Sequence, residues 1–257
     1  MFPKFNNIDN NELVRLSKKF NIEWRVVSKN NRNSIILFGK NVNNIFCLKQ
    51  IPLGNEDFKN LKNENLVDKK ENIAWMELHI LETLEKKHKS LKSQNFIHLY
   101  TKFVKLINDK PYLCLLFHNI PFTLYDMIHL YPYQMKDTIS FLIQLFFVAK
   151  YMNDEHILHN DLHYFNVMVD IPLHPIDLKF FDESTRTWYI LPKQDKIYYV
   201  IDYGVAEMNY SVSNFYEWKK FFTYFQSRLP FPFLISKMTS FTEMFQQILR
   251  LNHLKRL

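Results

Sequence analysis

Glycine is scarce in this chain, with only Gly39, Gly54 and Gly204 among 257 residues. Because glycine lets backbone amides approach a phosphate closely, any phosphate-binding site must form here without a glycine-rich loop. Cysteine is scarce as well, and Cys47 and Cys114 both lie in apolar runs. Two cysteines exclude a framework of several disulfides and favour a reducing, intracellular compartment.

Long apolar segments are also missing. The opening residues, "MFPKFNNIDN", lack the apolar core of a signal peptide. The most apolar run, "FLIQLFFVA", is too short to cross a bilayer and contains Gln144. The sequence therefore predicts an intracellular protein, cytoplasmic or nuclear, without a membrane span.

The chain is rich in apolar residues and in positive charge. Hydrophobic residues make up 47% of it and 24 are Phe, which is enough for a substantial core. The length allows one large domain or two lobes. The formal net charge of +7 fits an anionic partner such as a nucleotide, a nucleic acid or an acidic membrane face, without choosing among them.

Hydrophobic periodicity and turn residues predict a mixture of helices and strands. The expected elements are a helix at 9–20, strands at 23–27, 34–38, 45–51 and 112–117, helices at 74–87 and 136–156, a hairpin at 178–191, a strand at 196–204, and helices near 215–225 and 241–251. The polar stretch at 54–72 reads as an insert, and "LPFPF" breaks the last helical region. In the strand at 196–204, alternation puts Tyr198, Val200 and Asp202 on one face.

A lysine stands in an unexpected place in the strand predicted at 45–51. Alternation puts Ile45, Cys47, Lys49 and Ile51 on one face. An edge-strand lysine that extends into solvent would account for Lys49 without any function. Glu77, on the helix predicted at 74–87, would ordinarily be solvated too.

The stretch "HILHNDLHYFNVMVD", residues 156–170, gathers three histidines, two aspartates and one asparagine. His156, His159 and His163 could converge on a metal if they were helical, although their spacing matches no compact zinc signature. A nucleophile paired with histidine and a polar loop without chemistry are further readings. Residue types alone leave these readings open.

The order of motifs along the chain adds a resemblance. "HNDLHYFN" is similar to the catalytic loop of protein kinases, with His159, Asp161, Leu162 and Asn166 at the family's spacing. "VIDYGVAE" resembles their metal-binding Asp-Phe-Gly segment, and "FCLKQI" their Val-Ala-Ile-Lys strand. "MELHILETL" looks like their regulatory helix, and "YLCLLFHNIPFTLYDMI" like the hinge between their lobes. These five pieces occur in the family's order over residues 24 to 207.

The resemblance implies a role for each matching polar residue. Lys49 would hold the α- and β-phosphates of ATP, and Glu77 would anchor Lys49. Asp202 and Asn166 would bind Mg²⁺, and Asp161 would take the proton of the attacking hydroxyl. His163 would touch the γ-phosphate or satisfy a loop carbonyl. The residues implied to line the nucleotide slot are Cys47 above adenine, Met168 below it, Leu115 or Leu116 near the gatekeeper position, and Phe117.

The resemblance also implies an architecture: an α+β, two-lobed, kinase-like fold. A small β-rich lobe would cover residues 1–116, and a reduced, mainly helical lobe would cover 117–257. Asn160 replaces the arginine that usually receives a phosphorylated activation loop, so activity without such phosphorylation is expected. The inserted hairpin between Asn166 and Asp202, and the sequence Asp-Leu-His, are shared with haspin-like kinases.

The function implied is ATP-dependent transfer of phosphate to a serine or threonine hydroxyl of a protein. The small size resembles kinases of large DNA viruses, which would put the protein in a host cell or a virion. Alternatives are a small-molecule phosphotransferase of the aminoglycoside- or choline-kinase type, a pseudokinase that acts as a binding module, and a nucleic-acid-binding module.

Overall fold

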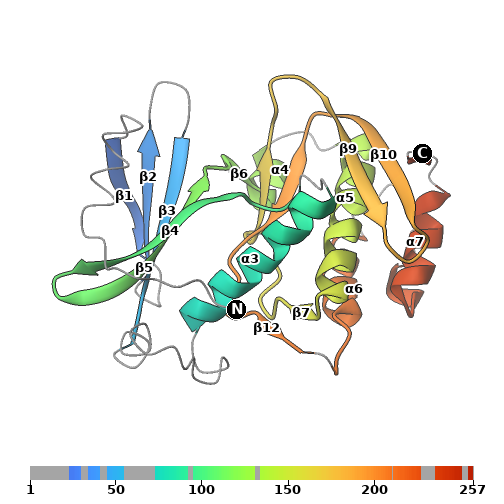
Figure 1. Cartoon of the computed structure of the whole chain (residues 1–257). Coiled ribbons are helices and arrows are strands. Elements are labelled where there is room, and N and C mark those ends of the chain that lie inside the picture. Colours follow the sequence, from blue (N-terminus) through green and yellow to red (C-terminus); the bar gives the residue numbers. More distant parts are fainter. Residues whose placement is uncertain are drawn as a thin grey trace. The chain divides into compact units, whose positions relative to one another are not determined.

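The computed structural model describes residues 23–29, 34–40, 45–54, 73–91, 95–130, 134–209, 211–226, 235–250 and 254–256 (Figure 1). It is a mixed α+β fold that divides into two compact units. Unit 1 comprises Met1–His79 and His98–Asn119, and unit 2 comprises Ile80–Ile97 and Ile120–Leu257. The expected helix at 9–20, nearly all of the insert at 54–72, and the "LPFPF" break lie outside the described residues.

Unit 1 contains a five-stranded antiparallel sheet in the order β1-β2-β3-β5-β4. Its strands are β1 (Glu23–Lys29), β2 (Ile35–Lys40), β3 (Ile45–Pro52), β4 (Leu99–Ile107) and β5 (Lys110–His118). The strands predicted at 23–27, 34–38, 45–51 and 112–117 are confirmed. Strand β4 was not predicted, because Lys102 and Lys105 interrupt its apolar pattern.

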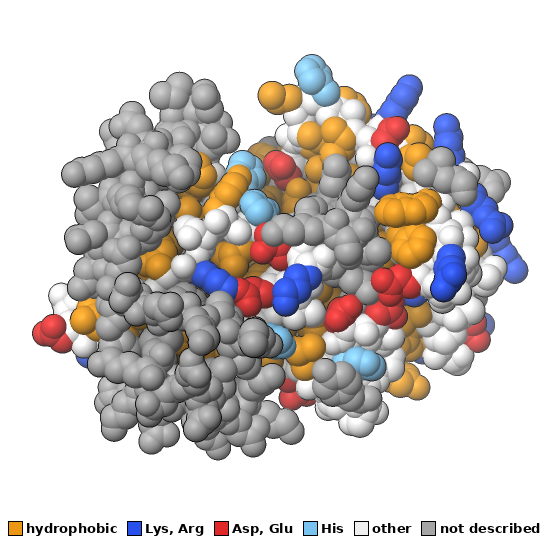
Figure 2. All heavy atoms as spheres, viewed as in Figure 1, with side chains coloured by type: hydrophobic (Ala, Val, Ile, Leu, Met, Phe, Trp, Pro, Cys, Tyr) orange, Lys and Arg blue, Asp and Glu red, His pale blue; other side chains and the backbone are white. Residues whose placement is uncertain are grey.

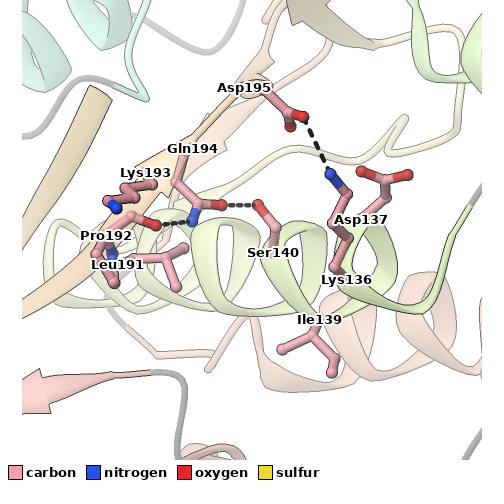
Figure 3. A pocket seen from close by; sticks show the side chains of 9 residues that line it. All are labelled: Lys136, Asp137, Ile139, Ser140, Leu191, Pro192, Lys193, Gln194 and Asp195. Carbon is pink, nitrogen blue, oxygen red and sulfur yellow. Dashed lines mark hydrogen bonds and ion pairs between the residues drawn. The ribbon is translucent and has the colours of Figure 1, made fainter. Parts of the chain in front are cut away.

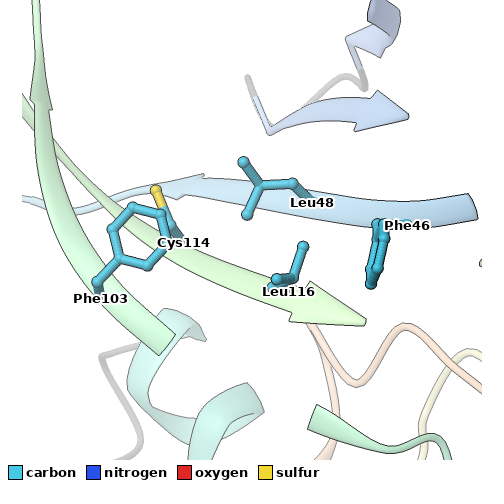
Figure 4. Close-up of a cluster of buried hydrophobic side chains, with 5 residues drawn as sticks. All are labelled: Phe46, Leu48, Phe103, Cys114 and Leu116. Carbon is cyan, nitrogen blue, oxygen red and sulfur yellow. The ribbon is translucent and has the colours of Figure 1, made fainter. Parts of the chain in front are cut away.

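One face of this sheet carries a compact apolar cluster (Figure 4). Its buried members are Phe46, Leu48, Phe103, Cys114 and Leu116. Leu48 pairs directly with Leu116, and directly opposed residues of antiparallel strands share a face. Lys49, one residue along β3, therefore belongs to the other face.

Helix α3 (Ile73–Leu91) confirms the helix predicted at 74–87. Trp75, Leu78, Leu81 and Leu84 recur every three residues and are all buried. That spacing gives the helix one apolar stripe. Residues 73–79 of α3 belong to unit 1 and the remainder to unit 2.

Unit 2 is built around α5 (Met135–Asp154), which is apolar on nearly all sides as the sequence predicted. The backbone amide of Gln134 donates to the Asp137 carboxylate at 3.0 Å at the start of the helix. Around α5 lie α6 (Phe215–Gln226) and α7 (Phe241–Leu249), which confirm the two helices expected near the C-terminus. The short α4 (Leu124–Leu130) and a 3₁₀ turn, Ile235–Lys237, complete the helical part.

The predicted hairpin is also confirmed, as β9 (Ile176–Asp182) and β10 (Thr187–Gln194). A third strand, β13 (Lys255–Arg256), pairs with β10. The Phe180 ring stacks on Phe147 of α5 with centroids 4.4 Å apart, and the Tyr151 hydroxyl bonds both the N–H and the carbonyl of Phe181. The buried Asp182 carboxylate pairs with Lys150 at 3.3 Å, so the hairpin is fixed to α5 by packing and by charge.

Two smaller sheets frame the segment 156–170. One contains β6 (Phe122–Thr123), β8 (Val167–Asp170) and β11 (Ile197–Val200), and the other contains β7 (Ile157–Leu158) and β12 (Glu207–Met208). The strand predicted at 196–204 ends at Val200, and Asp202 has φ 61. The expectation that Asp202 continues the strand face of Tyr198 and Val200 is therefore wrong. Among the described residues, none of the helices combines the length and apolar character needed to cross a membrane.

Candidate functional site

Lys49 and Glu77 form a tight ion pair within unit 1. Nζ of Lys49 lies 2.6 Å from Oε1 of Glu77, and the two side chains are 12% and 4% exposed. A carboxylate buried this deeply is tolerated when a cation compensates it. Lys49 thus does not extend from the sheet into solvent, and its ammonium is held at a defined position over one face of β3.

The register of the strands shows which apolar side chains accompany Lys49. Leu115 lies directly opposite Lys49, and Phe117 directly opposite Cys47. Leu116 pairs with Leu48 in the apolar cluster on the other face, so only Leu115 of the two gatekeeper candidates shares the face of Lys49. Burial raises the pKa of the Cys47 thiol to about 11, so this side chain is a neutral thiol at neutral pH.

In unit 2, the loop from His159 to Asn166 is tied to the segment that contains Asp202. The His159 ring nitrogen Nε2 lies 2.9 Å from the Ile201 carbonyl, and the Asn160 amide donates to the Val205 carbonyl at 3.2 Å. The Ile201 N–H donates to the Asn166 carbonyl at 3.0 Å. These bonds bring together two segments that the sequence separates by the whole β9–β10 hairpin.

Both segments contain strained backbone. Asn160 has φ 62 and Asp202 has φ 61. Positive φ is uncommon in residues other than glycine, and Asn and Asp tolerate it best. Such strain costs of the order of 1–3 kcal/mol and concentrates where a side chain must be aimed. Here it occurs immediately before Asp161 and at Asp202 itself.

Asn166 is fixed by its side-chain amide. Its Nδ2 donates to the backbone carbonyl of Asp161 at 2.9 Å and lies 3.5 Å from an Asp161 carboxylate oxygen. Within the described residues, its Oδ1 accepts no hydrogen bond. The amide group is thus oriented by its donor end, and its oxygen remains available to a hard cation, which prefers oxygen ligands.

The His163 ring is surrounded by residues of the same loop. The Phe165 N–H donates to Nδ1 at 3.2 Å, and the side-chain amide nitrogen of Asn166 lies 3.3 Å from Nε2. Nε2 lies 3.6 Å from Oδ1 of Asp161. The His163 ring thus lies between Asn166 and the Asp161 carboxylate, which is half exposed.

Aromatic rings pack against one another in and around this loop. Phe165 and Tyr164 both stack against Tyr125 of α4, with centroids 4.7 and 5.4 Å away. Tyr164 also stacks against Tyr224 of α6 at 5.7 Å. Stacked rings restrict the conformations of the loop between Asp161 and Asn166.

The three histidines that could have formed a metal site do not act together. His159 is fully buried and bonded to Ile201, and burial lowers its pKa, so the ring is neutral and structural. His156 is exposed. Throughout the described ranges, no three His, Cys, Asp or Glu side chains form a metal-binding group.

Sequence reasoning missed Glu217. Its Oε2 accepts the His159 N–H at 3.0 Å, and the Asn160 N–H also bonds this carboxylate. Burial raises its pKa, against the effect of these two amides. The one available signal was an acid in the first turn of an apolar helix, next to the fully buried Trp218. Glu217 holds the backbone immediately before Asp161.

The remaining predicted residue, Met168, is half-buried on β8, opposite Thr123 on one side and Tyr199 on the other. A separate small pocket of about 200 Å³ lies between the start of α5 and the end of β10 (Figure 3). It includes none of the predicted site residues. Lys136 forms an ion pair there with Asp195 at 3.4 Å, so the charges of these two side chains neutralise each other.

Neither a scan against protein-family models nor a search of curated proteins found a match to this chain.

Proposed function

We propose that the protein is an ATP-dependent phosphotransferase with a two-lobed, kinase-like architecture. The observation that carries the proposal is the convergence, in unit 2, of Asp161, Asn166 and the Asp202 segment through the hydrogen bonds of His159, Asn160 and Asn166. A carboxylate that can accept a proton and oxygen ligands for a hard cation are the groups that phosphoryl transfer requires.

Each residue has a role in the proposed reaction. Asp161 accepts the proton of the acceptor hydroxyl. At the same time the hydroxyl oxygen forms a bond to the γ-phosphorus, and the bond between the γ-phosphorus and the oxygen that leaves with ADP breaks. The His163 ring, whose Nε2 lies 3.6 Å from the same carboxylate, restricts its orientation. Glu217 keeps the loop backbone in place.

The donor set fits Mg²⁺. The Asn166 Oδ1 and the Asp202 carboxylate are oxygen ligands of the kind that Mg²⁺ prefers, with phosphate oxygens and water completing the shell. Bound Mg²⁺ would neutralise charge on the phosphates. Lys49, held by Glu77 in unit 1, would supply a further positive charge to the same nucleotide, with Cys47, Leu115, Phe117 and Met168 around the adenine. The single ammonium replaces part of what a glycine-rich loop would provide.

The preferred acceptor is a serine or threonine hydroxyl of a protein, in a haspin-like enzyme. Both the Asp-Leu-His sequence and the inserted β9–β10 hairpin support that reading. A small hydroxyl compound remains the second candidate, because Asp161-Leu162-His163 also resembles the loop of aminoglycoside and choline kinases.

The test is transfer of labelled γ-phosphate from Mg-ATP to a panel of protein and small-hydroxyl acceptors. The wild type should label at least one acceptor. Asp161→Asn should reduce the rate by about 10²–10⁴ while its melting temperature stays close to that of the wild type. Equal rates for wild type and variant, or no transfer by a folded wild type, would overturn the proposal.

A further inference from the structure

The β13-β10-β9 sheet of unit 2 has two chemically different faces. Leu178, Phe180, Tyr189 and Leu191 point inward and are buried. Alternation along the strands leaves a second set of side chains on the outer face. The outer face consists of Lys179, Phe181, Trp188, Ile190 and Lys255, which are all exposed or half-buried.

A row of two lysines crosses this outer face. Ile190 of β10 lies directly opposite Lys179 of β9 on one side and Lys255 of β13 on the other. Two strand spacings separate the lysine backbones by about 10 Å. Both lysines are exposed, and Figure 2 shows basic side chains over this part of unit 2.

Further charges around the sheet are mostly positive. Arg186 at the hairpin turn, Lys193 near the end of β10 and Arg256 of β13 are exposed. The exposed carboxylates of this sheet and its turn are Asp177, which accepts the Lys193 backbone N–H at 2.9 Å, and Glu183. The surface therefore favours a polyanion.

An aromatic pair lies on the same face as the lysine row. Phe181 and Trp188 are direct cross-strand partners with ring centroids 5.0 Å apart. The backbone of Phe181 is anchored by the Tyr151 hydroxyl, so the pair is attached to a rigid strand. Both rings are half-buried, so each keeps an exposed part that a planar group could contact.

We propose that this outer face binds single-stranded nucleic acid, independently of the proposed phosphotransfer. Lys179 and Lys255 contact phosphates, and Trp188 with Phe181 stacks on bases. A duplex hides its base faces, so the nucleic acid that could stack on these rings is an unpaired strand. The sequence shows no compact basic-aromatic motif, because the residues at 179–190 and at 255 meet only when β13 pairs with β10.

The test measures fluorescence polarisation of labelled single-stranded RNA and DNA of about 20 nucleotides with the full chain. Binding should weaken steeply between about 50 and 200 mM salt. Lys179→Glu with Lys255→Glu should abolish it. Trp188→Ala should weaken binding of the single strand about tenfold. Trp188→Phe keeps an aromatic ring and should retain most of the affinity, which would show that the loss in Trp188→Ala is not caused by misfolding.

A matched control keeps the charge change but moves it elsewhere. Lys86→Glu with Lys110→Glu alters two exposed lysines outside this sheet and should leave binding nearly unchanged. If this control variant lost as much binding as Lys179→Glu with Lys255→Glu, net charge alone would explain the effect and the proposal would be overturned. Equal or tighter binding to duplex DNA, to vesicles of anionic lipid or to an acidic peptide would overturn it as well, as would unaltered binding in Trp188→Ala.

Discussion

Nζ of Lys49 lies 2.6 Å from Oε1 of Glu77, 28 residues further along the chain, and both side chains are largely buried. Removing one partner of a buried ion pair leaves the other charge uncompensated. Lys49→Met should therefore lower the free energy of unfolding by about 3 kcal/mol. The double variant Lys49→Met with Glu77→Leu should lose less than Lys49→Met alone.

Urea denaturation of the two single variants and the double variant gives the coupling energy directly. Glu77→Leu serves as the matched single control. Strictly additive losses would mean that the pair contributes nothing to the fold and would leave Lys49 without a defined position.

The side-chain amide of Asn166 is held through its Nδ2, while its Oδ1 stays available. Substitutions should therefore separate the effect of the nitrogen from the effect of the oxygen on phosphotransfer. Asn166→Ala removes both and should reduce phosphotransfer by tenfold or more, with partial recovery at high Mg²⁺ concentration. Asn166→Asp keeps oxygen ligands but loses the donor to Asp161, so its Mg²⁺ requirement should change less. Rates measured across a Mg²⁺ titration distinguish the two. Identical titration curves would argue against a metal-binding role for Asn166.

Much of the fold could be predicted from sequence where the signal is local. The apolar α5, the β9–β10 hairpin and the alternating β3 follow from periodicity and turn residues. The pairing of Lys49 with Glu77 came from the motif resemblance, and no periodicity would have predicted it.

Other features depend on tertiary structure that local patterns do not encode. β4 was missed because Lys102 and Lys105 break its apolar pattern, although pairing with β5 stabilises it. Asp202 leaves the strand with a positive φ because the loop from His159 to Asn166 binds its neighbours. That Leu115, and not Leu116, lies on the face of Lys49 follows only from the β3–β5 register.

Glu217 should make stability depend on pH. Burial raises its pKa above the usual 4.5, so the folded state binds a proton more tightly than the unfolded state. The resulting stabilisation is complete below pH 4.5 and is lost as the pH rises through the folded pKa. Glu217→Gln keeps an acceptor for the His159 N–H and should remove this dependence.

Urea denaturation between pH 4 and pH 8 measures how Glu217 affects the free energy of unfolding. The stability of the wild type relative to Glu217→Gln should fall as the pH rises. Glu217→Ala, which also removes the acceptor, should be less stable than Glu217→Gln by about 1–3 kcal/mol. A pH-independent difference between wild type and Glu217→Gln would contradict the burial argument.

Lys102 should show a pH dependence at higher pH. Burial lowers its pKa from 10.5 to about 8, so its charged form destabilises the folded state. That cost is full below pH 8 and disappears as the pH rises toward 10.5. Lys102→Met should therefore be more stable than the wild type at pH 7, and the two should converge near pH 10. Lys105→Met, on the same strand, is the matched control.

The proposed function requires Lys49 and Asp202 to act on one magnesium-bound nucleotide. The most direct measurement is the melting temperature of wild type, Lys49→Met and Asp202→Asn with and without Mg-ATP. At a concentration about 100 times its Kd, Mg-ATP should stabilise the wild type by roughly 2.7 kcal/mol. Both variants should lose most of that gain, and Asp202→Asn should also lose the difference between Mg-ATP and ATP with chelator. A wild-type gain that persists in both variants, or no gain in the wild type, would contradict the account.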